Sequence, residues 1–129
     1  MPNKSIQTDA APAAIGTYSQ AMSTTAVRHV FLSGQIPLDP VSMTLVSDDF
    51  AEQAHQVFKN LSAVATAAGG TLADCAKLTV YLTDLDNFPA LNEVMAGYFS
   101  EPYPARAAVE VSKLPKDASI EIDAIMAFE

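Results

Sequence analysis

A long stretch of helical periodicity in the middle of the chain limits the folds open to this sequence. Between Asp49 and Ala68 the apolar residues recur at spacings of three and four, so they share one face of a helix. Asp49 and Glu52 resemble a capping box, and Gly69-Gly70 supplies the residue type that commonly ends a helix. A helix with one apolar face must pack against a second layer of structure.

Segments with strand character supply that layer. The predicted strands are Tyr18–Ser23, Val27–Gln35, a short one around Met43–Val46, Ala76–Thr83, Ala105–Ser112 and Ser119–Phe128. A second helix is predicted at Phe88–Phe99, and Met1–Thr8 reads as a short polar arm. We expect the first two strands to pair as a hairpin, and the last two strands likewise. This order predicts an α+β fold, with a mixed sheet of about six strands and two helices on one face.

Alternation in the last two strands predicts which side chains face the helices. In the final strand Ile120, Ile122, Ala124, Met126 and Phe128 share one face. In Ala105–Ser112 the apolar set is Ala105, Ala107, Val109 and Val111, which we expect to face the helices. The opposite face would then carry Arg106, Ala108, Glu110, Glu121 and Asp123. Such a half-polar face must be covered by water or by another subunit.

Composition excludes several classes of protein. At 129 residues the chain is expected to be one domain, residues 1–129, because single cores typically run to about 100–150 residues. Its single cysteine excludes an internal disulfide and a cysteine metal cluster, and we expect neither a metal nor a cofactor. The net charge of −8, with scattered cations, argues against a nucleic-acid partner. Without an apolar span or a signal peptide, the protein is predicted to be cytoplasmic and not membrane-bound.

Several motifs together resemble the RidA (YjgF) family over almost the whole chain. The strongest is Pro104–Val111 (PARAAVEV), followed by Leu114-Pro115-Lys116 and Ile120-Glu121-Ile122. Ala11–Gly16 with Tyr18-Ser19-Gln20 is similar to the family's N-terminal motif, and Leu32–Pro37 to its second strand and turn. The resemblance implies a chorismate-mutase-like α+β fold, assembled as a homotrimer with clefts between subunits. It also implies a deaminase that hydrolyses 2-iminobutanoate and 2-iminopropanoate and so protects pyridoxal-phosphate enzymes.

The resemblance assigns roles to particular residues of this sequence. Arg106 would bind the carboxylate of the imino acid through two parallel hydrogen bonds, and Glu121 would orient or deprotonate the attacking water. The other positions that match the lining of the family's cleft are Tyr18, Ser33, Gly34, Asn92 and Ala108. We expect the site to be composite across a subunit boundary.

One residue departs from the family's pattern, and two rival functions stay open. Many relatives have a cysteine two positions after the arginine, where this chain has Ala108. We expect only its backbone to matter, because adding water to an imine requires no thiol. The first rival is a non-catalytic module that binds a keto or amino acid; it would need Arg106 but not Glu121. The second is RNA cleavage or a chaperone role, and the charge balance disfavours the former.

Overall fold

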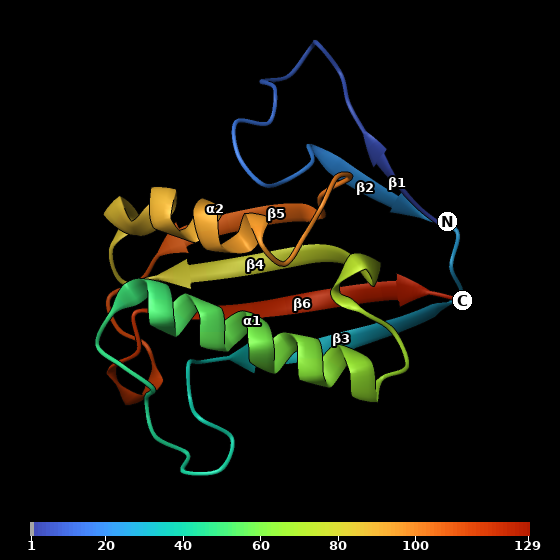
Figure 1. The fold of residues 1–129 in the computed structure, drawn as a ribbon. Helices are drawn as coiled ribbons and strands as arrows, with labels where there is room; N and C mark the ends of the chain where they lie inside the picture. Colours follow the sequence, from blue (N-terminus) through green and yellow to red (C-terminus); the bar gives the residue numbers. More distant parts are fainter. Residues whose placement is uncertain (1) are drawn as a thin grey trace.

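The structure, a computed structural model, describes residues 2–129 and has two layers (Figure 1). The strands are β1 (Asn3–Ile6), β2 (Ala21–Thr24), β3 (Arg28–Gln35), β4 (Cys75–Leu82), β5 (Ala105–Glu110) and β6 (Ile120–Phe128). The helices are α1 (Phe50–Ala67) and α2 (Phe88–Ala96), with short 3-10 turns at Leu72–Asp74, Leu85–Asn87 and Pro115–Asp117. Both α-helices lie on the same face of a sheet, so the predicted α+β class and helix layer are confirmed.

The six strands do not form one continuous sheet. Four of them form a mixed sheet in the order β3-β6-β4-β5, while β1 and β2 form a separate antiparallel ribbon. Within the larger sheet, β4 and β5 run parallel and the other neighbours run antiparallel. A single bridge between Ser19 and Ala105 joins the segment before β2 to the start of β5. The ribbon therefore lies beside the β5 edge of the sheet.

The first helix forms as its periodicity predicts. The side chain of Asp49 accepts a hydrogen bond from the backbone N–H of Glu52 at 3.0 Å, which caps the N-terminus. Ala54, Val57, Phe58, Leu61 and Ala65 on its inner face are fully buried against the sheet. Their partners on the sheet include Leu78, Val80, Leu82, Ile120 and Ile122, which are also fully buried. This interface is the hydrophobic core.

Both predicted hairpins are wrong in their pairing. Within the polar arm, Asn3–Ile6 form strand β1, which pairs with β2, so β3 is left to pair with β6; Met1 lies outside the described residues. Asn3 holds the ribbon in place, because its side-chain amide donates to the carbonyl of Ala127 at 2.9 Å. At the other end of the chain, β4 lies between β5 and β6. The reason is that β4 carries the fully buried Leu78, Val80 and Leu82, which belong at the centre of the sheet.

One predicted strand is absent, and one helix ends earlier than predicted. The segment around Met43–Val46 is a loop with one isolated bridge, between Leu38 and Leu45, because Met43 has a φ of 59° that a strand cannot contain. The second helix ends at Ala96 rather than Phe99, since Gly97 follows and glycine lowers helix stability. No helix within residues 2–129 is both long enough and apolar enough to cross a bilayer.

The predicted face of β5 is reversed. Arg106 pairs in register with Leu78 and Ala108 with Val80, so these two side chains lie on the helix side. Ala107 and Val109 lie on the opposite, uncovered side, where Val109 is 44% exposed. The prediction failed because alanine and valine occur both in a core and on a surface, so their alternation does not fix the face. In addition, β5 is an edge strand that only the short helix α2 covers, which leaves room there for a long polar side chain. The predicted face of β6 is correct, since Ile120 and Ile122 are buried and Glu121 points away from the helices.

Candidate functional site

Arg106 lies where the edge strand β5 passes beneath helix α2. On that helix Asn92 and Met95 are one turn apart and therefore share a face, which is turned toward the arginine. Thr17, in the loop before β2, approaches the same guanidinium from the other side. Three segments that are remote in sequence thus meet at one cation.

A closed set of hydrogen bonds fixes the inner nitrogen of this arginine. Arg106 Nη1 donates to Asn92 Oδ1 at 2.8 Å and to Thr17 Oγ1 at 3.0 Å. The Thr17 hydroxyl in turn donates to Asn92 Oδ1 at 3.0 Å. Both hydrogens of Nη1 are therefore committed to neutral oxygens, and the thioether sulfur of Met95 lies 3.6 Å away. The guanidinium is held without any carboxylate.

Two aromatic rings lie close to the guanidinium. Its central carbon lies 5.0 Å from the ring centroid of Tyr18 and 5.8 Å from that of Phe88, within the range of cation–π attraction. Burial lowers the pKa of Arg106 from its ordinary value, and the neighbouring Tyr18 hydroxyl opposes that change. Because an arginine pKa starts so high, the group keeps its charge at neutral pH.

This charge has no acidic partner in the described part of the chain. The single ion pair among residues 2–129 joins Lys113 to Asp117, both on the surface. A half-buried cation that is held by neutral groups attracts a mobile anion, because the desolvation has already taken place and the positive charge is uncompensated. The arrangement suits a ligand with a carboxylate.

A cavity of about 570 Å³ opens onto this cation. It is lined by Ile15, Gly16, Tyr18, Phe88, Pro89, Asn92, Arg106 and Ala108. Four of the residues predicted from the sequence therefore come together here: Arg106, Tyr18, Asn92 and Ala108. Much of the remaining lining is apolar, which suits a small ligand with one charged end.

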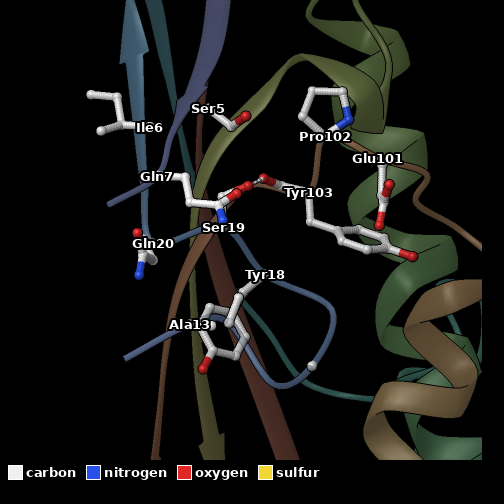
Figure 2. Close-up of a pocket in the computed structure, with 12 residues that line it drawn as sticks. Ser5, Ile6, Gln7, Ala13, Tyr18, Ser19, Gln20, Glu101, Pro102 and Tyr103 are labelled. Atoms are coloured by element: carbon white, nitrogen blue, oxygen red, sulfur yellow. Dashed lines mark hydrogen bonds between the residues drawn. The ribbon is translucent and has the colours of Figure 1, made fainter. Parts of the chain in front are cut away.

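A second hollow, of about 480 Å³, lies on the other side of Tyr18. It opens between the β1–β2 ribbon and the segment from Glu101 to Tyr103 (Figure 2). Gly16 and Tyr18 line both cavities, so the tyrosine lies between them. The lining of the second hollow includes no lysine or arginine, and its one charged group is the carboxylate of Glu101. A carboxylate ligand is therefore attracted to the Arg106 cavity instead.

The other predicted residues lie on the uncovered face of the sheet. Ser33 and Gly34 form a β-bulge in β3, since the register passes from the Leu32–Ala124 pair to the Gln35–Ile122 pair. A Cβ atom at Gly34 would overlap the carboxylate of Glu121, so glycine at this position makes room for that side chain. The structure brings Gly34 and Glu121 together but places them on the opposite face from Arg106, with β4 between β5 and β6.

The surroundings of Glu121 combine polar and apolar groups. The Tyr81 hydroxyl donates to Asp123 Oδ2 at 3.0 Å, and this hydrogen bond raises the pKa of Tyr81 above its ordinary value. Phe31 is 72% exposed and Val109 44% exposed on this face. An uncovered sheet face with exposed apolar side chains is typical of a surface that another protein covers. Among residues 2–129, no three His, Cys, Asp or Glu side chains are placed to share a metal ion.

Three residues that contact Arg106 were not among the predicted site residues: Thr17, Phe88 and Met95. Thr17 is a buried hydroxyl in a loop, and no periodicity or charge pattern distinguishes it. Phe88 was assigned to the start of the second helix, and its ring reaches back over the guanidinium. A signal for Phe88 was available, because it lies four residues before Asn92 and hence on the same helix face.

Comparisons with known proteins give consistent matches over the whole length. The sequence model described as Endoribonuclease L-PSP matches residues 8–128. Protein DfrA of Myxococcus xanthus is 49% identical over 125 residues, which cover 97% of this chain and 95% of that protein. The 2-iminobutanoate/2-iminopropanoate deaminase of Rattus norvegicus is 47% identical over 122 residues, covering 95% and 88%. The crystal structure of RidA from an Antarctic Psychrobacter species is 51% identical, with a TM-score of 0.76 and coverage of 97% and 99%.

Proposed function

Because this chain belongs to the RidA (YjgF) family, we propose that it hydrolyses short 2-imino acids to 2-keto acids and ammonia. The substrates are 2-iminobutanoate and 2-iminopropanoate or their enamine forms, which are released by pyridoxal-phosphate enzymes. Removing them in the cytoplasm protects such enzymes from attack by the reactive intermediates. The reaction is a hydrolysis, in which the water oxygen bonds to C2, the C=N bond breaks and nitrogen leaves as ammonia.

One observation carries the proposal: a half-buried guanidinium with no acidic partner faces a cavity large enough for a small acid. The carboxylate of an imino acid neutralises Arg106 and so fixes the position of the adjacent C=N carbon. Imines hydrolyse readily without a catalyst, so holding the reacting carbon in place supplies much of the acceleration. Burial strengthens the attraction, because water screens it less.

The attacking water requires a second group, and within one chain Glu121 is on the wrong face to reach it. We propose that the protein assembles as a homotrimer, in which the uncovered face of one copy meets the Arg106 cavity of the next. The exposed Phe31 and Val109 favour such an interface. Glu121 of the neighbouring copy then orients or deprotonates the water. Gly34 keeps the space that this carboxylate occupies.

Relatives support the coarser part of this proposal. Mammalian relatives named as 2-iminobutanoate/2-iminopropanoate deaminases are 43–47% identical over more than 90% of this chain. Other relatives at similar identity, such as Protein DfrA, have names that state no reaction. The family supports an enzyme, and the identity of its substrate depends on the chemistry of the site.

A non-catalytic binding module is the alternative that the structure favours most. The cation, its neutral partners and the cavity are all complete within one chain, whereas Glu121 lies elsewhere. A protein that only retained a keto or amino acid would need nothing more. The experiment below separates this alternative from the deaminase.

The family description mentions an endoribonuclease, and this chain offers little for that chemistry. Its net charge is −8. His29 lies on strand β3, while His55 lies on α1 and its ring nitrogen is 3.0 Å from the Tyr98 hydroxyl, so the two histidines do not form a pair. A phosphate backbone requires clustered cations, which favours a small acid as the ligand of the single Arg106.

The proposal is tested by Arg106→Ala in an assay where a dehydratase releases 2-iminobutanoate from threonine and its disappearance is followed. Wild type accelerates the loss, and the variant loses about a hundredfold in kcat/KM, because the charge-assisted contact to the carboxylate is gone. Arg106→Lys falls between the two, since it keeps the charge without the planar fork. Unchanged activity in Arg106→Ala contradicts the proposal.

Arg28→Ala is the matched control. Arg28 also lies over an aromatic ring, 4.7 Å from the centroid of Phe128, and it donates to the carbonyl of Ala68, but it is outside the cavity. Its replacement should leave the rate of imine loss unchanged. If wild type binds 2-ketobutanoate yet leaves imine loss at the spontaneous rate, the binding module is the correct function instead.

A further inference from the structure

We propose that Thr17 is a positioning residue for the carboxylate-binding half of the site, an inference that rests on the proposed function. Thr17 is 8% exposed, and its hydroxyl has two partners, since it accepts from Arg106 Nη1 and donates to Asn92 Oδ1. A buried hydroxyl that satisfies both roles holds its partners in a single arrangement. Its effect on a ligand is indirect, because it acts through Arg106 and Asn92.

The hydroxyl determines which way the Asn92 amide points. Asn92 Oδ1 accepts from both Thr17 Oγ1 and Arg106 Nη1, so the amide oxygen is occupied and the Nδ2 group is the part of the amide left free to donate. A reversed amide would place N–H donors against the guanidinium and the hydroxyl, and at least one contact would be lost. Thr17 and Arg106 thus leave the asparagine with a free N–H donor beside the cavity.

The same hydroxyl determines which edge of Arg106 is free. With both hydrogens of Nη1 committed to Thr17 and Asn92, a carboxylate must approach through Nη2 or Nε. A Cβ built on Gly16 would lie 3.3 Å from Arg106 Nη2, 3.2 Å from Asn92 Nδ2 and 3.3 Å from Asn92 Oδ1. Because Oδ1 already accepts from two donors, the groups beside that glycine that can still donate to a ligand are Nη2 and Nδ2.

The space beside Gly16 is the expected position of the carboxylate. Within residues 2–129 neither Arg106 Nη2 nor Asn92 Nδ2 has a hydrogen-bond partner, and neither is sealed from solvent. Both atoms belong to residues that line the cavity, as does Gly16. The geometry therefore assigns one carboxylate contact to the guanidinium and one to the asparagine amide, with the positions of both set by Thr17.

Thr17→Val and Thr17→Ser form the test, because valine matches threonine in shape and serine keeps the hydroxyl. Calorimetry with 2-ketobutanoate, which binds without reacting, should show binding about tenfold weaker in Thr17→Val and within about twofold of wild type in Thr17→Ser. In the imine assay Thr17→Val should raise KM more than it lowers kcat. Thr83→Val, a partly buried threonine outside the cavity, should leave binding unchanged.

Gly16→Ala tests the position of the ligand separately. The added methyl would occupy the space where Nη2 and Nδ2 converge, so we expect 2-ketobutanoate binding to fall at least tenfold while the melting temperature changes little. Equal binding by wild type and Thr17→Val, or equal losses in Thr17→Val and Thr17→Ser, would overturn the positioning role. These outcomes leave the Arg106→Ala result unaffected, so failure here is distinct from failure of the proposed reaction.

Discussion

The two faces of the four-stranded sheet hold different halves of the candidate site. On the helix side Arg106 is fixed by Thr17 and Asn92 and faces a cavity, so the half that we propose binds the carboxylate is complete within one chain. On the uncovered side Glu121 lies against Gly34 with no cavity of its own among those described. In the proposed reaction, carboxylate binding and water activation therefore belong to separate faces of one chain, and assembly of copies would be needed to join them.

The first prediction tests whether Arg106 and Glu121 of one site come from different copies of the chain. Arg106→Ala and Glu121→Gln are each expected to be nearly inactive in the imine assay. When the two variants are unfolded together and refolded, mixed trimers should recover about a quarter of wild-type activity, because each site takes its arginine and its glutamate from different copies.

The control is the same mixture without unfolding, in which chains keep their original partners. It should show only the sum of the two residual activities. Refolded mixtures that also show no more than this sum would contradict a composite site. In that case both residues act within one chain, and the sheet would have to rearrange to bring them together.

A second prediction concerns the uncovered face alone. Gly34→Ala places a methyl group where the Glu121 carboxylate lies, and such overpacking costs about 1–3 kcal/mol or displaces the side chain. We expect kcat to fall about tenfold while 2-ketobutanoate binding, which depends on Arg106, stays within about twofold. Gly97→Ala is the control, since its nearest contact would be an ordinary 3.4 Å from the carbonyl of Val94. Loss of ligand binding instead of kcat would show that the two faces are not independent.

The sequence predicted local structure better than strand neighbours. Helix α1 follows from its apolar stripe and its Asp49 cap, and both are local signals. The position of β4 between β5 and β6 is set by how the fully buried Leu78, Val80 and Leu82 pack against the helices. Alternation within one strand cannot reveal which strand becomes its neighbour, and so both hairpin predictions were wrong.

The site was predictable as a set of residues but not as a geometry. Arg106 was expected on the same face as Glu121, because Ala105, Ala107 and Val109 are apolar enough for the core. The structure instead uses the space beside α2 for the guanidinium. The residues that hold it lie 89 positions (Thr17) and 14 positions (Asn92) away in the sequence, in other elements, and periodicity within one element does not relate them to Arg106. The structure gathers four of the residues at one cavity, and the roles of all seven in binding or catalysis remain predictions.

The smallest expected effect comes from Ala108, where many relatives have cysteine. Ala108 is half-buried beside Arg106 and lines the cavity, so Ala108→Cys adds one sulfur atom near the ligand without touching the hydrogen bonds of Thr17 and Asn92. Water attacks an imine without a thiol nucleophile, and therefore we expect kcat/KM to change by less than about threefold. The existing thiol cannot substitute, because Cys75 is buried in the core and burial raises its pKa to about 12. Iodoacetamide at pH 8 should accordingly leave wild-type activity intact. For Ala108→Cys, a gain of more than about tenfold in kcat/KM would contradict this prediction and show that a thiol at position 108 takes part in the reaction.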